Sequence, residues 1–169
     1  MEAHSHQPLD ARQNQIRLLS VDRNLTSTAK VQCHLEAFNL DDAPNFSALS
    51  YRWEYPEPSD TQLPSPKVSR SIVVNGKTFP VSENLANFLD VFHKQPQNKP
   101  IWLWIDQICI NQRDVFERNH QVKRMSTIYS QCETVIIWLA KASDAYVGAL
   151  KDPYFTRVWV VQEVLLARH

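Results

Sequence analysis

Short apolar runs separated by polar turns dominate this chain. Five of them have the length and the β-branched or aromatic content of strands: residues 15–21, 30–39, 45–53, 101–105 and 134–139. Residues 30–39 alternate between apolar and polar, as a half-buried strand does. The runs IWLWI at 101–105 and TVIIWL at 134–139 are almost wholly apolar, which is typical of strands covered on both faces.

Turn and helix signals lie between these runs. Asn75-Gly76 in the middle of residues 71–81 is a strong hairpin signal, and Ser82 is a good N-cap for a helix that follows directly. Further helices are expected over 114–131, 143–150 and 155–167. The alternation of strand and helix predicts an α/β fold with a mostly parallel sheet flanked by helices, to which the N-terminal half adds antiparallel hairpin elements.

The chain is most simply one domain. Residues 1–15 are polar and predict a flexible leader, and residues 16–169 form the domain itself. Residues 54–70 hold many of the ten prolines, so we expect a long proline-rich surface loop there.

Composition excludes several functions. Eighteen basic residues balance eighteen acidic ones, which argues against nucleic acid as a partner. No apolar run is long enough to span a bilayer, and the N-terminus lacks the apolar core of a secretory signal. Three cysteines without CxxC spacing fit reduced thiols in the cytoplasm better than a zinc site. Only two glycines are present, too few for a Walker A loop or a GxGxxG turn.

Polar side chains gather where two predicted strands end. Asp106 and Gln107 follow the run 101–105, with Asn111 and Gln112 shortly after. Strand ends of this kind form the ligand crevice of α/β sheets. The alternative for Asp106 is a turn bonded to the backbone around 108–110. The run 45–53 ends in a hydroxyl, a phenol, a guanidinium and an indole: Ser50, Tyr51, Arg52 and Trp53. Arg52 could pair with a phosphate or with a neighbouring carboxylate.

The final predicted helix, TRVWVVQEVLLAR, is apolar nearly all round yet contains Glu163. Trp159 lies four residues earlier and so shares a face with it. A buried carboxylate is costly unless it is paired or faces a polar cleft. Glu163 is therefore either paired with a basic neighbour or functional, and the residues alone leave both open.

Other candidate groups carry less weight. Cys109 and His120 could form a nucleophile and base, but Cys109 lies inside an apolar triplet, where cysteines are usually inert. His4 and His6 make a weak metal site, because no further ligands follow at suitable spacing. Glu117 is expected on the solvated face of helix 114–131, with the basic residues around it.

Several blocks together resemble a known family. ALSYRWE, then IVVNG and NL, then LWIDQICINQ followed by ER..QV..M..IY, then VIIWL and YFTRVWVVQEVLLA resemble the fungal heterokaryon incompatibility (HET) domain over about residues 45–168. The blocks occur in the family's order. One departure is Glu54, where the family usually has glycine after the tryptophan of its SYxW block, and a charge there could alter the mouth of a site.

HET domains in turn resemble TIR domains, and this similarity implies a TIR-like (flavodoxin-like) fold. RVWVVQE is similar to the TIR stretch in which a tryptophan precedes a catalytic glutamate by four positions. The resemblance implies that Glu163 cleaves NAD with Trp159 in support, that the SYRW residues Ser50, Tyr51, Arg52 and Trp53 bind the nucleotide, and that Asp106 shapes the cleft. NAD would be a substrate, and no prosthetic group or metal is implied.

The implied biology is regulated cell death in fungal incompatibility or immunity. TIR-like proteins often self-associate, so a homo-oligomer is expected. A non-catalytic signalling module that acts only by self-association is the rival from another class. An enzyme that processes a different nucleotide is the rival among enzymes.

Overall fold

The computed structural model describes residues 2–10, 12–22, 30–53, 70–95 and 101–139. The predicted proline-rich loop, the helices at 143–150 and 155–167, and with them Trp159 and Glu163, lie outside these residues. The elements follow the order β1 (Gln15–Val21), β2 (Gln32–Asn39), a 3-10 turn (Leu40–Asp42), β3 (Phe46–Tyr51), β4 (Arg70–Val74), β5 (Lys77–Val81), α1 (Glu83–Phe92), β6 (Trp102–Trp104), α2 (Asp106–Cys109), α3 (Val115–Lys123), α4 (Met125–Gln131) and β7 (Thr134–Trp138).

Within the described residues, one seven-stranded sheet has the order β5-β4-β2-β1-β6-β3-β7. The α/β class is confirmed, but the sheet is mixed rather than mostly parallel. β1–β2, β1–β6 and β4–β5 pair antiparallel, and β2–β4, β3–β6 and β3–β7 pair parallel. The prediction came from the strand–helix–strand alternation of the second half. That part does form a parallel unit, in which β6 and β7 flank β3 and the helices connect them.

The hairpin predicted at residues 71–81 is confirmed, and the N-terminal half contains a second antiparallel pair. β1 pairs with β2 over its whole length, and β4 joins β5 through Asn75 and Gly76, both at positive φ (49° and 76°). This is the backbone that an Asn-Gly turn favours. The Asn75 amide also accepts a hydrogen bond from Leu35 N at 3.0 Å and donates one to Leu35 O at 2.9 Å. The turn therefore ties the hairpin to β2.

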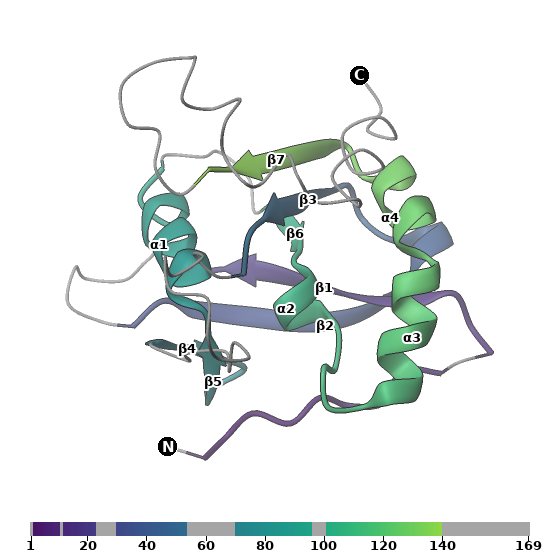
Figure 1. The fold of residues 1–169 in the computed structure, drawn as a ribbon, viewed down its shortest axis with the longest axis horizontal. Helices are drawn as coiled ribbons and strands as arrows, with labels where there is room; N and C mark the ends of the chain where they lie inside the picture. Colours follow the sequence, from purple (N-terminus) through teal and green to yellow (C-terminus); the bar gives the residue numbers. More distant parts are fainter. Residues whose placement is uncertain (1, 11, 23–29, 54–69, 96–100, 140–169) are drawn as a thin grey trace, which may run out of the picture.

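Helix α1 lies toward one end of the strands and α3 and α4 toward the other, with α2 between them (Figure 1). Figure 1 shows α1 beside the ends of β3 and β7, with α3 and α4 at the other end and α2 just after β6. The core between them consists of fully buried side chains from most elements, including Trp104, Leu18, Leu49, Leu89 and Ile108. Burial of this apolar surface is the main stabilising term. No helix among the described residues is long and apolar enough to cross a membrane.

The helix predicted over 114–131 is two helices. The backbone breaks at Arg124, which has φ −101° and ψ 0°. Gln121, in the last turn of α3, and Arg124, at the break, both donate to Gln15 O, at 2.9 and 3.2 Å. Arg124 also bonds to Asn14. These contacts with the start of β1 accompany a bend that periodicity alone does not show.

The N-terminal segment, residues 2–7, lies against β5 and α2. Thr78 N donates to Glu2 O and His4 N donates to Thr78 O, both at 2.9 Å, and Ala3 forms a parallel bridge with Thr78. Further along, His6 Nε2 lies 2.7 Å from Ile108 O. The segment predicted to be a flexible leader thus makes defined contacts, and its mobility in solution stays a prediction.

Candidate functional site

The predicted strand-end residues come together at one edge of the sheet. Because β3 runs parallel to both β6 and β7, the carboxyl ends of these three neighbouring strands meet. Arg52 and Trp53 follow β3, Asp106 follows β6, and Trp138 ends β7. The edge therefore has the placement that ligand sites take in α/β sheets.

A direct hydrogen bond joins the two sequence motifs. Trp53 Nε1 donates to Asp106 Oδ2 at 2.9 Å, and the other carboxylate oxygen accepts from Gln107 N at 2.8 Å. The alternative of a turn bonded to the backbone around residues 108–110 stays a prediction beside these two contacts. The Asp106 carboxylate holds the indole ring of Trp53 at the sheet edge. Trp53 and Asp106 are each half-buried, so both also face solvent.

Gln107 connects this edge to α1. Its side-chain oxygen accepts from Tyr51 OH at 3.3 Å and from both Ser82 N and Ser82 Oγ at 3.2 Å. Ser82 Oγ also accepts from Leu85 N, which confirms the predicted N-cap. One amide thus fixes the start of α1 relative to β3 and β6.

Asn84 and Trp138 complete a group of hydrogen-bonded residues at the carboxyl ends of β3, β6 and β7. We call this group the carboxyl-end cluster; it consists of Arg52, Trp53, Asp106, Gln107, Asn84 and Trp138. The strand-end pattern did not reveal Asn84 or Trp138. Asn84 Nδ2 donates to Arg52 O at 2.6 Å, and Trp138 Nε1 donates to Asn84 Oδ1 at 2.9 Å. Asn84 is buried, with an exposed fraction of 2%. The sequence signal for Asn84 was an amide in the first turn of a largely apolar helix, because an amide that becomes buried there needs hydrogen-bond partners.

The other predicted residues differ in exposure. Ser50 and Tyr51 are buried, with exposed fractions of 1% and 2%, whereas Arg52 is half-buried. Burial favours a supporting role for Ser50 and Tyr51 and leaves Arg52, Trp53 and Asp106 as the accessible groups. The ligand contacts of all five stay predictions, as do the roles of Glu163 and Trp159, which lie outside the described residues.

Behind α2 lies a buried ion pair that the sequence reading missed. Arg17 and Glu117 are joined at 2.7 Å, and their side chains are only 4% and 9% exposed. The prediction that Glu117 lies on the solvated face of its helix is wrong. Burial by itself would raise the pKa of Glu117, but hydrogen bonds from Arg17 and Asn111 N, with the nearby guanidinium charge, outweigh it and lower that pKa.

The thiol and imidazole candidates do not form a reactive site. Burial raises the pKa of Cys109 to about 12, and its exposed fraction is 1%, so the expected inert packing role is confirmed. His120 is exposed on α3. Across the ranges that the structure describes, no group of three or more His, Cys, Asp or Glu side chains could hold a metal ion.

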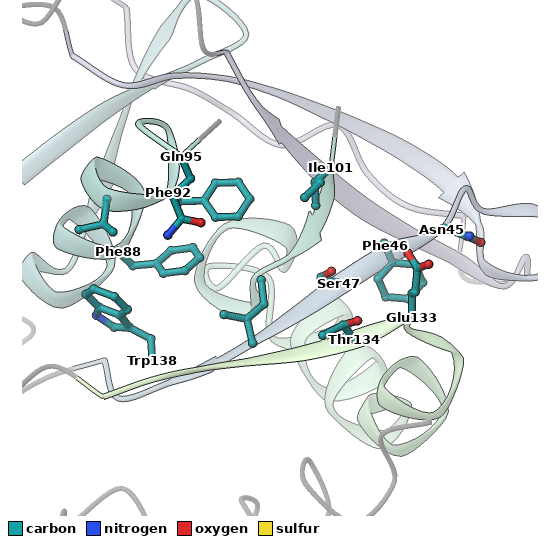
Figure 2. Close-up of a pocket in the computed structure, with 12 residues that line it drawn as sticks. Asn45, Phe46, Ser47, Phe88, Phe92, Gln95, Ile101, Glu133, Thr134 and Trp138 are labelled. Carbon is teal, nitrogen blue, oxygen red and sulfur yellow. The ribbon is translucent and has the colours of Figure 1, made fainter. Parts of the chain in front are cut away.

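A cavity of about 660 Å³ lies next to the cluster, between α1 and the β3–β7 face. Figure 2 shows Phe88, Phe92 and Trp138 at one end and Asn45, Glu133 and Thr134 at the other. The rings of Phe88 and Trp138 meet edge to face, with centroids 5.6 Å apart. Since Trp138 also bonds to Asn84, the aromatic end of the cavity is connected to the carboxyl-end cluster.

Comparison with known proteins gives two matches. The family model described as Heterokaryon incompatibility protein (HET) matches residues 46–152. The curated protein "Heterokaryon incompatibility protein 6, OR allele" of Neurospora crassa is 34% identical over 136 residues, covering 76% of this chain. The chain spans 19% of the length of that relative. No solved structure matches.

Proposed function

The chain belongs to the heterokaryon incompatibility (HET) family, and from that premise we propose that it cleaves NAD at the nicotinamide–ribose bond to trigger regulated cell death in a fungus. Its site would be the carboxyl-end cluster, and its fold would be TIR-like. The matched relative is about five times as long as the stretch that this chain covers. The activity of a whole protein is therefore also part of the proposal.

The observation that supports the proposal most is the Trp53–Asp106 bond at the shared strand edge. It holds an aromatic ring beside the half-buried Arg52. A dinucleotide offers flat rings that stack on indole and a pyrophosphate that pairs with guanidinium. In this arrangement Arg52 and Trp53 bind the nucleotide, and Asp106 shapes the cleft without taking part in the chemistry.

Glu163 would supply the chemistry. Loss of nicotinamide leaves an oxocarbenium-like ribose, which a neighbouring carboxylate stabilises as it does in glycoside hydrolysis. Trp159, on the same predicted helix face, would support the position of Glu163. The reaction needs no phosphate-binding glycine loop, in keeping with the two glycines of this chain.

The test is to incubate the purified protein with NAD and to follow nicotinamide by chromatography. The Glu163→Gln variant keeps the side-chain size and removes the charge, so the rate should fall by roughly 10²-fold or more. Glu36→Gln, which removes an exposed carboxylate on β2, is the matched control and should cleave at the wild-type rate. A folded Glu163→Gln variant with full activity would show that Glu163 is not the catalytic residue.

A non-catalytic module acting by self-association is the second candidate. It is favoured by Phe116 and Val115 at the start of α3, which are 89% and 51% exposed, because exposed apolar groups mark association surfaces. Absence of nicotinamide release at every protein concentration, together with concentration-dependent assembly in sedimentation, would favour this function in the cytoplasm over the enzyme.

A further inference from the structure

The side chain of Arg17 makes four hydrogen bonds. It projects from β1 and donates to both oxygens of Glu117, at 2.7 and 2.9 Å, which is the paired geometry that guanidinium and carboxylate favour. The same group donates to Cys109 O at 3.0 Å and to Gln7 O at 2.6 Å. One buried guanidinium therefore joins β1, α2, α3 and the N-terminal segment.

One of these contacts, with Cys109 O, lies at the end of α2, and α2 begins with the candidate site residue Asp106. The helix has only four residues, Asp106–Cys109, and a single turn is not stable without external contacts. Asp106 and Gln107 begin it, while Cys109 O at its end accepts from Arg17. Because α2 is a single turn, a shift of Cys109 at its end is expected to move Asp106 at its start.

The loop after α2 is fixed by the same pair. Asn111 N donates to Glu117 Oε1 at 2.7 Å, so the carboxylate that binds Arg17 also sets the backbone beyond α2. Gln112 Nε2 then reaches back to Asp106 O at 2.9 Å. The buried pair thus connects, through the loop, to the residue that holds the Trp53 ring.

The N-terminal segment adds a third support. His6 contacts Ile108 O, and Gln7 O accepts from Arg17, so both bind beside the end of α2. The rings of His4 and His6 each lie 5.6 Å from the ring of Phe79 in β5, which anchors the segment to the hairpin.

We infer that Arg17 is a positioning residue of the candidate site and that, with Glu117 and the N-terminal segment, it sets the place of α2 and hence of Asp106 and the Trp53 ring. The inference rests on the proposed function only in taking this cluster as the site of nucleotide cleavage. Its structural content, that Arg17 and Glu117 control the Trp53–Asp106 contact, is testable without activity.

The experiment uses the indole N–H resonances of the five tryptophans in ¹⁵N-labelled protein. Trp53→Phe assigns the Trp53 signal and Trp138→Phe assigns that of Trp138. Glu117→Gln removes the buried charge at nearly constant shape, and Arg17→Lys removes the paired geometry at constant charge. In both variants the Trp53 resonance is expected to shift, while the Trp138 resonance, which reports the Asn84 contact on the other side of the cluster, stays in place.

Two results would overturn the inference. An unchanged Trp53 resonance in both variants would show that α2 is held without Arg17, and equal shifts of Trp53 and Trp138 would show a general loss of structure. Glu36→Gln is the control and should leave both signals unchanged. Where the wild type cleaves NAD, kcat/KM should fall by roughly 10²-fold in both variants, since a displacement of about 1 Å costs rates of this order. If the wild type does not cleave NAD, only this kinetic measurement is lost, and the comparison of the Trp53 and Trp138 resonances still tests the inference.

Discussion

The charge of Glu117 is retained in a buried position because its partners favour the ionised form. Its carboxylate receives two hydrogen bonds from Arg17 and one from Asn111 N. A buried pair of this kind contributes little net stability compared with apolar residues, yet the loss of one partner leaves an uncompensated charge. Single and double substitutions separate the net contribution of the ion pair from the cost of leaving one of its charges unpaired.

Replacement of Arg17 by Met should lower the free energy of unfolding by about 3–5 kcal/mol, because Glu117 is left buried without its partner. The double variant Arg17→Met with Glu117→Leu should recover most of this loss. Urea denaturation monitored by fluorescence measures both values. A double variant as unstable as Arg17→Met would show that the hydrogen bonds to Cys109 and Gln7, rather than the charge, are what the protein needs.

At this scale the sequence allowed part of the strand-end cluster to be predicted, whereas its role as a site stays a prediction. The strand-end rule identified Arg52, Trp53 and Asp106, because strand ends can be read from local apolar patterns. It did not identify Arg17 with Glu117, which are one hundred positions apart in the chain. Glu117 was placed on a solvated face since its neighbours in sequence are charged, and only the packing of α3 against β1 reverses that.

Among the elements, the β4–β5 hairpin depends on its two turn residues. Gly76 has φ +76°, and an added Cβ would meet nothing within 4 Å. Gly76→Ala should therefore cost only the backbone strain of that conformation, about 1–2 kcal/mol. Asn75→Ala should cost more, because it adds the loss of both hydrogen bonds to Leu35. Thermal unfolding measures the two, and a larger loss for Gly76→Ala would contradict this ranking.

The elements themselves were largely predictable, whereas their breaks were not. Periodicity gave β1 at residues 15–21 and the cap at Ser82, since both depend on local side-chain chemistry. The break at Arg124 and the single turn of α2 depend on contacts with β1, which the local pattern does not contain.

For the whole molecule, acid should weaken stability before the carboxylates titrate. Burial lowers the pKa of His4 and of His6 below the ordinary value of 6.5, helped by the charges of Lys77 and Arg17 for His4 and of Arg17 for His6, while backbone hydrogen bonds and, for His6, Glu117 oppose the shift. Below pH 6.5, His4 and His6 therefore bind protons more readily in the unfolded chain than in the folded chain. Stability should be complete above about pH 6.5 and fall as the pH drops below it.

Urea midpoints at pH 7.5 and 5.5 measure this dependence. The lowered pKa of Glu117 keeps it ionised across that interval, so the two histidines dominate the change. The double variant His4→Asn with His6→Asn should show a smaller difference between the two pH values than the wild type. His34→Asn, at an exposed position on β2, is the matched control. An undiminished difference in the double variant would place the titrating groups elsewhere.

The topology of the sheet was the least predictable property. Alternation of strand and helix correctly indicated the parallel unit of β6, β3 and β7. It could not show that β1 inserts antiparallel between β2 and β6, because the pattern of a strand indicates which face is buried and not which strand lies beside it.

The contact of residues 2–4 with β5 has a consequence for how the protein behaves at high concentration. β5 is the outermost strand of the described sheet on that side, and Glu2 and His4 occupy the backbone groups of Thr78. A strand whose backbone groups are unoccupied is a template for another chain, which leads to aggregation. Glu2, which also pairs with Lys77 at 3.1 Å, is thus expected to help to keep separate copies from joining their sheets.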